Sequence, residues 1–193
     1  MAHKFNPSHK EKLDNPKRRE ALPPYDTLKR LRLSEGDIIA DIGCGIGYFT
    51  LSAAELSGPG GKVYALDISD EMLDETKKAA MEKGFTNIEL VRNTEYDLVI
   101  GGESVTYCFI SLVLHEVDDL KRYVEEIGRI LRCGGRLAII EWQKIVSDFG
   151  PPVDHRLDRV ELIDLLESKG YLMEEQLELG VDYYAIVAVK EKN

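Results

Sequence analysis

The 193-residue chain has few cysteines and histidines, and neither kind is grouped along the sequence. Its three cysteines, Cys44, Cys108 and Cys133, are far apart and odd in number, so we expect reduced thiols with structural roles. The four histidines have no ligand spacing with the cysteines or with one another. The sequence therefore predicts no metal site.

Long apolar runs and an excess of basic charge are also missing. The chain has no run of about 18 apolar residues, and the segment 1–7 lacks the apolar core of a signal peptide, which predicts a cytoplasmic protein without a membrane partner. Basic side chains number 25 against 35 acidic ones, and the formal net charge of -10 disfavours a nucleic-acid partner. The length fits one well-buried domain, and nothing in the sequence indicates the oligomeric state.

Segments with strand and helix character alternate after residue 36. This alternation predicts a parallel sheet with helices on both of its faces. The short link 179–182 permits only a hairpin, so the sheet is expected to end antiparallel. The connection 92–104 has little helical pattern and is predicted to be a loop. The expected strands are 37–42, 62–67, 87–91, 105–112, 135–141, 171–179 and 182–190, and the expected helices lie near 47–57, 70–83, 117–131 and 156–169.

Capping residues mark the ends of the predicted helices. Ser69-Asp70 and Asp118-Asp119 can accept hydrogen bonds from the free N–H groups at helix starts. Gly84, Gly134-Gly135 and Gly170 are interpreted as helix ends, because glycine adopts the left-handed conformation that terminates many helices.

A glycine-rich turn, Asp41-Ile42-Gly43-Cys44-Gly45-Ile46-Gly47-Tyr48-Phe49-Thr50, joins the first expected strand to the first helix of the sheet. Glycines permit positive φ and let backbone N–H groups approach a ligand, which is typical of a nucleotide site. A buried anion at Asp41 would oppose a pyrophosphate at the helix start. The same anion would favour a ligand with ammonium and sulfonium charges. The turn therefore favours S-adenosylmethionine over NAD.

Asp67 ends the second expected strand, where an acid can accept hydrogen bonds from both hydroxyls of a ribose. NAD and S-adenosylmethionine both carry that ribose, so Asp67 does not separate them, and an aspartate that only caps the next helix is the structural alternative. The glycines at 43, 45 and 47 are spaced more tightly than in G-x-G-x-x-G. This spacing makes NAD the less favoured interpretation.

Four segments in this order make the chain similar to class I S-adenosylmethionine-dependent methyltransferases of the small-molecule type, from about Lys4 to the C-terminus. They are 41–50, 66–73, 112–117 and 131–137. The resemblance implies a Rossmann-like, doubly wound α/β fold. Its seven-stranded sheet would be mostly parallel with an antiparallel C-terminal hairpin strand, in the order 3-2-1-4-5-7-6. It also implies methyl transfer from S-adenosylmethionine to a small-molecule acceptor that the sequence does not identify, with S-adenosylhomocysteine as product. A non-catalytic module that binds S-adenosylmethionine is one alternative, and a nicotinamide-dependent oxidoreductase is a weaker one.

The resemblance also implies roles for individual residues. The glycine turn would pass beside the methionyl part, with Asp41 orienting its ammonium group, and Asp67 would hold the ribose diol. Ile68 would lie against the adenine, and backbone near Leu112 would meet the amino acid end. One of Asn93, Thr94 and Glu95 would contact the adenine amino group, and the sequence does not choose among them. The implied cofactor residues are Asp41, Gly43, Gly45, Gly47, Asp67, Ile68, Asn93, Glu95 and Leu112.

Two histidines are candidates for a residue facing the acceptor. His115 follows the fourth strand at the carboxyl edge, where ligands bind in open α/β sheets, and it could act as a general base toward an alcohol, phenol or carbon acid. Its structural alternative is a hydrogen-bonded strand cap. His155 follows the fifth strand, and the structural alternative is that it lies in a solvated loop before a helix. Glu141-Trp142 could form one wall of the site, and a tryptophan packed on the surface is the alternative. The absence of an Asn/Asp-Pro-Pro-aromatic motif after the fourth strand disfavours methylation of DNA adenine or glutamine.

The chain is expected to be a single domain over 1–193, with 1–33 as an N-terminal arm and helix. Phe5, Leu13 and Leu22 stand among charged residues of this arm. The arm could fold over the cofactor as a lid that excludes water, and a loosely ordered tail is the alternative.

Overall fold

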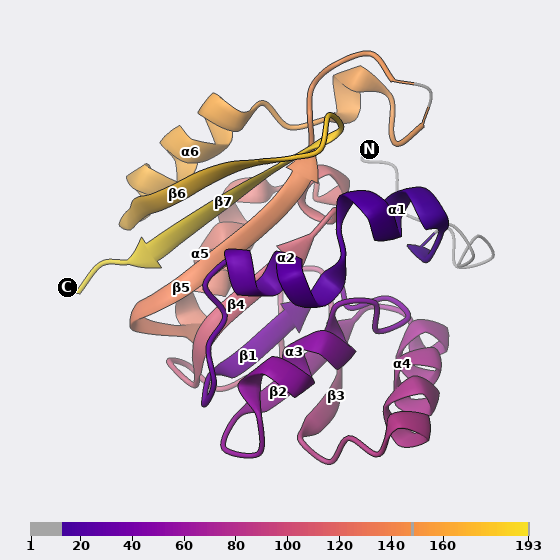
Figure 1. Ribbon diagram of the computed structural model, residues 1–193. Helices are drawn as coiled ribbons and strands as arrows, with labels where there is room; N and C mark the ends of the chain where they lie inside the picture. The colour runs from indigo at the N-terminus through magenta and orange to yellow at the C-terminus, as the bar shows by residue number, and fades with distance from the viewer. Residues whose placement is uncertain (1–12, 148, 193) are drawn as a thin grey trace.

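A seven-stranded sheet forms the centre of the computed structural model, which describes residues 13–147 and 149–192 (Figure 1). The strand order is β3-β2-β1-β4-β5-β7-β6. Neighbouring strands from β3 to β5 are parallel, and β7 is antiparallel to both β5 and β6. The expected fold class and strand order are therefore confirmed. The strands are β1 Ile38–Ile42, β2 Lys62–Asp67, β3 Ile88–Arg92, β4 Val105–Ser111, β5 Leu131–Trp142, β6 Tyr171–Leu179 and β7 Tyr183–Lys190.

Helices cover both faces of the sheet, with α2, α3 and α4 on one face and α5 and α6 on the other (Figure 1). The remaining helix, α1, lies at the edge toward which the arrowheads of the parallel strands point. No helix of the described residues is long and apolar enough to cross a membrane. The helices are α1 Pro16–Ala21, α2 Pro24–Arg30, α3 Thr50–Ser57, α4 Asp70–Lys83, α5 Leu120–Ile130 and α6 Arg159–Ser168, with short 3-10 turns at η2 Leu114–Glu116 and η3 Val153–His155.

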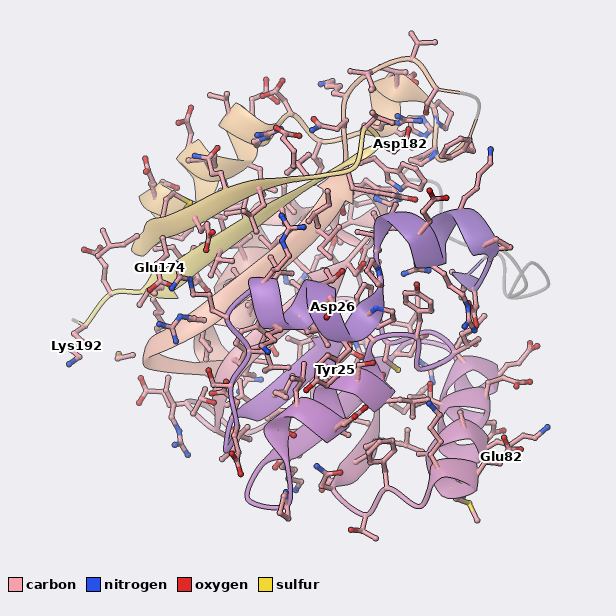
Figure 2. The ribbon with its side chains drawn as sticks, viewed as in Figure 1. Tyr25, Asp26, Glu82, Glu174, Asp182 and Lys192 are labelled. Atoms are coloured by element: carbon pink, nitrogen blue, oxygen red, sulfur yellow. The ribbon has the colours of Figure 1, made fainter. Side chains whose placement is uncertain are left out.

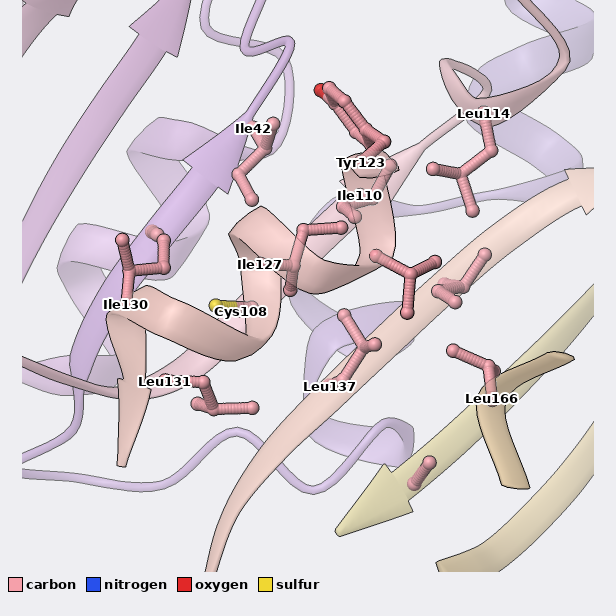
Figure 3. Packing of buried hydrophobic residues seen from close by; sticks show 14 of the residues in the cluster. Ile42, Cys108, Ile110, Leu114, Tyr123, Ile127, Ile130, Leu131, Leu137 and Leu166 are labelled. Carbon is pink, nitrogen blue, oxygen red and sulfur yellow. The ribbon is translucent and has the colours of Figure 1, made fainter. Parts of the chain in front are cut away.

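The strands divide their side chains between two cores. Because successive side chains point to opposite faces of a strand, alternate residues belong to different clusters. On β4, Cys108 and Ile110 pack toward α5 with Ile127, as Figure 3 shows, whereas Tyr107 and Phe109 pack toward α2 and α3. Burial of each large apolar side chain contributes roughly 1.5–3 kcal/mol. The two cores therefore fix where each parallel strand ends.

The local capping signals locate α4 correctly. The Ser69 hydroxyl accepts a hydrogen bond from Met72 N at 3.4 Å, and Gly84 follows the last turn with a left-handed φ of 73°. The predicted helix 70–83 is confirmed. The predicted hairpin between β6 and β7 is confirmed as well, and the described connection 93–104 contains no helix.

The interpretation of Gly134-Gly135 as a helix end is wrong. Helix α5 ends at Ile130 and β5 begins at the next residue, so both glycines lie inside the strand. Gly134 has a φ of 76°, and the register between β4 and β5 shifts between Val105 and Tyr107. The positive φ therefore belongs to an irregularity of the strand and not to a helix end.

Candidate functional site

The site is built where five parallel strands end. Asp41 is near the end of β1, Asp67 ends β2, and Asn93 directly follows β3. Leu112 directly follows β4, and Glu141 is near the end of β5. Parallel strands place their carboxyl ends at one edge of the sheet, where ligands bind in this class of fold. Residues predicted from separate parts of the sequence thus share one edge.

The glycine loop is held tightly against the end of β2. The N–H groups of Gly43 and Cys44 donate to the carbonyl oxygen of Leu66 at 2.8 and 2.9 Å. The N–H group of Gly45 donates to Asp67 Oδ2 at 2.9 Å. Gly43 has a φ of 74°, and a Cβ there would lie 2.4 Å from a methyl carbon of Val113. Only glycine fits this turn, which brings the β1 loop and the β4 loop into contact.

Backbone strain marks the β4 loop at the same place. Leu112 has a φ of 60°, a left-handed conformation that costs a non-glycine residue about 1–3 kcal/mol. Its N–H group donates to the Ile140 carbonyl oxygen at 2.9 Å, so the strained residue is tied to β5. Strain of this kind tends to persist at functional sites, where the surrounding structure holds it.

Asp41 is a buried carboxyl group with an unusual proton affinity. Only 3% of the residue is exposed, and its Oδ2 accepts a hydrogen bond from the Thr50 hydroxyl at 2.6 Å. Burial raises the pKa of Asp41 to about 7, with a further contribution from the nearby Asp67. The Thr50 hydrogen bond and the positive charge of Arg18 act in the opposite direction. A cation at this place would stabilise the ionised form.

The Asp67 carboxyl group is oriented by the backbone. Its Oδ1 accepts from Ser69 N at 2.8 Å, and its Oδ2 accepts from Gly45 N. Burial raises the pKa of Asp67, although these two backbone hydrogen bonds oppose the shift. A carboxylate has about four lone-pair positions, so two bonds leave capacity for a diol. The adjacent Ile68 is 44% exposed, an apolar side chain beside the buried acid.

The residues after β3 differ sharply in environment. Asn93 is buried, its Nδ2 donates to the Thr94 carbonyl oxygen at 2.8 Å, and its Oδ1 is buried without a hydrogen-bond partner. Glu95 accepts a hydrogen bond from Asp118 N at 3.4 Å. A buried acceptor without a partner is costly and calls for a ligand or water donor.

His115 forms a buried pair with Glu141. His115 Nδ1 lies 2.8 Å from Glu141 Oε2, and the exposed fractions of the two side chains are 8% and 0%. Glu141 also accepts hydrogen bonds from the backbone N–H groups of His115 and Trp142, each at 3.3 Å. Burial alone would lower the pKa of His115, but attraction to Glu141 and Glu116 and the hydrogen bond to Glu141 raise it overall. The carboxylate holds the proton on Nδ1, so Nε2, which lies 3.8 Å from Glu116 Oε1, is the ring atom left to exchange a proton.

The structure does not bring His155 into this pair. His155 ends η3 with an exposed side chain, whereas the next residue, Arg156, is only 3% exposed. Arg156 donates to the carbonyl oxygens of Gln143, Ile145 and Phe149 at 2.9–3.0 Å and thereby organises the loop after β5. In this segment the arginine, and not the histidine, holds the loop in place.

Aromatic rings and the hairpin turn pack against the end of β5. The Trp142 ring centroid is 4.6 Å from that of Tyr183 and 6.3 Å from that of Phe149. Gln143 N donates to the Asp182 carbonyl oxygen at 2.8 Å. Figure 2 shows Asp182 in the turn between β6 and β7, at the same end of the molecule as α1. That Trp142 forms one wall of the site stays a prediction.

The N-terminal arm covers the glycine loop. A Cβ on Gly45 would lie 3.3 Å from Leu13 Cδ1, and the Tyr48 hydroxyl donates to the Leu22 carbonyl oxygen at 2.9 Å. Phe5, the other apolar residue expected to contribute, lies outside the described residues. Sequence reasoning missed Arg18, whose guanidinium carbon is 4.5 Å from the centre of the Tyr48 ring. The sequence does indicate the helix that carries Arg18, because Asn15-Pro16 places a capping residue and a proline at a helix start.

The sheet order, the glycine loop after β1 and the acid after β2 together define a class I S-adenosylmethionine-dependent methyltransferase fold. The sequence model of the ubiE/COQ5 methyltransferase family matches residues 25–150, and the chain belongs to this family.

Individual relatives agree with this assignment. A crystal structure of a "SAM dependent methyltransferase from Aquifex aeolicus" matches with a TM-score of 0.90 and 31% identity, over 96% of this chain and 98% of that one. Two relatives named demethylmenaquinone methyltransferase, from Anoxybacillus flavithermus and Oceanobacillus iheyensis, are 32% and 33% identical over 116 residues. That match covers 60% of this chain and 49% of each relative, so the chain spans about half the length of the curated relatives it matches.

Proposed function

We propose that this chain is an S-adenosylmethionine-dependent methyltransferase that acts on a small-molecule acceptor. The observation that carries the proposal is the pair of buried carboxyl groups, Asp41 and Asp67, set around a glycine loop at the carboxyl edge of the sheet. Family membership and the likeness to a solved methyltransferase over nearly its whole length support the same activity.

The residues present fit this cofactor. Asp41 would face the ammonium group and Asp67 the ribose hydroxyls, while Gly43, Gly45 and Gly47 would line the methionyl part and the backbone of Leu112 its amino acid end. Ile68 offers exposed apolar surface for the adenine ring, and the buried Asn93 Oδ1 has no partner and could accept from its amino group. When bound, S-adenosylmethionine supplies a methyl group on a sulfonium, and the thioether of S-adenosylhomocysteine is the leaving group. Glu95 already accepts from Asp118, so Asn93 is the better candidate for the adenine contact.

His115 is proposed as the general base toward the acceptor. Glu141 fixes its Nδ1, so Nε2 would receive the proton when an acceptor hydroxyl or carbon acid attacks the methyl group. This buried pair distinguishes the proposal from a module that only binds the cofactor, because binding alone does not require an oriented base at the edge. No role in transfer is proposed for His155.

Turnover with a defined acceptor tests the function and separates the two histidines. Demethylmenaquinone, the substrate in the relatives' names, is the first acceptor to assay with methyl-labelled S-adenosylmethionine. We expect labelled product and S-adenosylhomocysteine, a decrease of about 100-fold or more in kcat/KM for His115→Ala, and nearly unchanged turnover for the control His155→Ala. Cofactor binding without turnover on any acceptor of a metabolite pool would support the non-catalytic alternative.

The pH profile of Glu141→Gln tests the role of the pair. Glu141 raises the pKa of His115 against burial, so its removal lowers that pKa. The acidic limb of log kcat/KM should therefore move to lower pH, and the alkaline plateau should fall because the base is weaker. An acidic limb that stays in place would argue against His115 as the titrating base.

Three further expectations are retained as proposals. The net charge of -10 supports a protein without a nucleic-acid partner. A cytoplasmic location stays a prediction. The continuous sheet supports a single methyltransferase domain that includes the arm.

A further inference from the structure

Arg18 of helix α1 is an isolated cation beside the proposed cofactor site. Its guanidinium carbon lies 4.5 Å from the Tyr48 ring centre and 5.8 Å from that of Phe49, the two aromatic residues that directly follow the glycine loop. Nη1 donates to the Leu13 carbonyl oxygen at 2.8 Å. Helix α1 itself is fixed by Asn15, whose side chain accepts from Arg18 N at 3.1 Å. The side chain is thus held in one place over the loop.

Arg18 is half-buried and has unused hydrogen-bonding capacity. Its Nε is buried and has no hydrogen-bond partner. Burial lowers the pKa of Arg18, although the carboxyl groups of Asp14 and Asp41 oppose this shift. A buried donor that is left unpaired is unfavourable unless a ligand satisfies it.

The carboxyl groups near Arg18 are already engaged. Asp14 accepts both Nε and Nη2 of the neighbouring Arg19 at 2.5 Å. Asp41 is hydrogen-bonded to Thr50 and is shared with the proposed ammonium group. Within residues 13–147 and 149–192, no ion pair of Arg18 with a carboxylate is found. The planar fork of its guanidinium remains suited to an incoming carboxylate.

We infer that Arg18 binds the α-carboxylate of S-adenosylmethionine, while Asp41 binds the α-ammonium group of the same ligand. This inference rests on the proposed function. The two side chains carry opposite charges and flank one glycine loop, which matches the zwitterion at the methionyl end. The N-terminal arm is then part of the cofactor site, and the bound ligand holds α1 over the loop.

Decarboxylated S-adenosylmethionine provides the test, because it keeps the sulfonium and the ammonium group and lacks only the carboxylate. Calorimetric titration of Arg18→Gln should show S-adenosylmethionine bound roughly 10- to 100-fold more weakly than by the wild type. Binding of the decarboxylated ligand, and of 5′-methylthioadenosine, should change less than threefold. Arg18→Lys, which keeps the charge and loses the fork, should lie between the wild type and Arg18→Gln.

Lys17→Gln is the matched control on the same helix. Lys17 is exposed and its Nζ lies over the Phe149 ring at 4.6 Å, so its loss removes one positive charge and leaves the Asp14–Arg19 pair intact. Affinity for all three ligands should stay within twofold. Unchanged binding of 5′-methylthioadenosine also shows that Arg18→Gln has not unfolded the site.

The remaining outcomes separate the inference from the function on which it rests. Equal weakening of S-adenosylmethionine and its decarboxylated form by Arg18→Gln would overturn the carboxylate contact. An unchanged cofactor affinity with a raised KM for the acceptor would overturn it too and would place Arg18 against an anionic acceptor. A wild-type protein that binds none of the adenosyl ligands would instead remove the proposed function.

Discussion

At the scale of single residues, the charge state of Asp41 connects the stability of the protein to its ligand. The carboxyl group is buried, and its pKa of about 7 means that near neutral pH it is only partly ionised. A sulfonium and ammonium ligand requires the ionised form. Cofactor binding should therefore release a proton from Asp41 whenever the pH lies below about 7.

This linkage predicts a pH-dependent affinity. As the pH falls from 7 to 5.5, the dissociation constant for S-adenosylmethionine should rise by up to about tenfold per pH unit, because Asp41 must lose its proton before it can pair. Above pH 7 this contribution is absent. Titration calorimetry of the wild type and of Asp41→Asn across this range measures the pH dependence of the dissociation constant. If the variant shows the same pH dependence as the wild type, another group causes the effect.

The same residue predicts an opposite effect on folding. Because the pKa of Asp41 is raised in the folded state, its contribution favours folding at low pH and is lost as the pH rises through about 7. Asp41→Asn should therefore unfold at a higher temperature than the wild type at pH 8 in the absence of ligand, and this advantage should shrink at pH 5.5. Such a variant would be more stable but would bind the ligand more weakly. This trade-off between stability and function is common at functional sites.

At the scale of elements, the contact between the glycine loop and the β4 loop can be tested with two glycines of nearly equal φ. Gly43 and Gly84 have φ values of 74° and 73°, but a Cβ would lie 2.4 Å from Val113 at the first and would meet nothing within 4 Å at the second. Gly84→Ala should cost about 1 kcal/mol of unfolding free energy. Gly43→Ala should cost roughly 1–3 kcal/mol more, from overpacking.

Ligand affinity should separate the same two variants. Gly43→Ala pushes the β4 loop away from the cofactor site, so S-adenosylmethionine binding should fall at least about tenfold, whereas Gly84→Ala should bind normally. Adding Val113→Ala to Gly43→Ala should restore part of the loss, because the two side chains compete for one space. Denaturant unfolding and titration of these three variants and of Val113→Ala alone check this, and a double variant whose effect equals the sum of the two single ones would refute the proposed clash.

The elements that the sequence predicts well are those with local signals. Helix α4 is bounded by its own caps, Ser69 and Gly84, and the alternation of elements leads directly to the sheet. The Gly134 prediction failed because a glycine indicates a positive φ without indicating the element that contains it. The pairing of His115 with Glu141 joins the turn η2 after β4 to the end of β5, and no local pattern reports such a contact.

At the scale of the whole molecule, the proposed site gathers contributions from most of the sheet and from the arm. Asp41, Asp67, Asn93, Leu112 and Glu141 follow or end five different strands, and α1 lies across their edge (Figure 1). A ligand that touches so many elements binds only the folded chain. Its binding free energy should therefore add to the stability of the entire domain and not to one segment.

Thermal unfolding then separates the cofactor hypotheses. At a concentration 100 times its dissociation constant, S-adenosylmethionine should add about 2.7 kcal/mol, which for a chain of this length corresponds to roughly 5–11 °C in Tm. NAD at the same concentration should leave Tm unchanged, because its pyrophosphate would meet the Asp41 carboxylate beside the glycine loop. S-adenosylhomocysteine keeps the ammonium and ribose groups and should also stabilise. A protein stabilised by NAD and indifferent to both adenosyl ligands would mean that the buried acid at the end of β1 does not select the charge of the ligand.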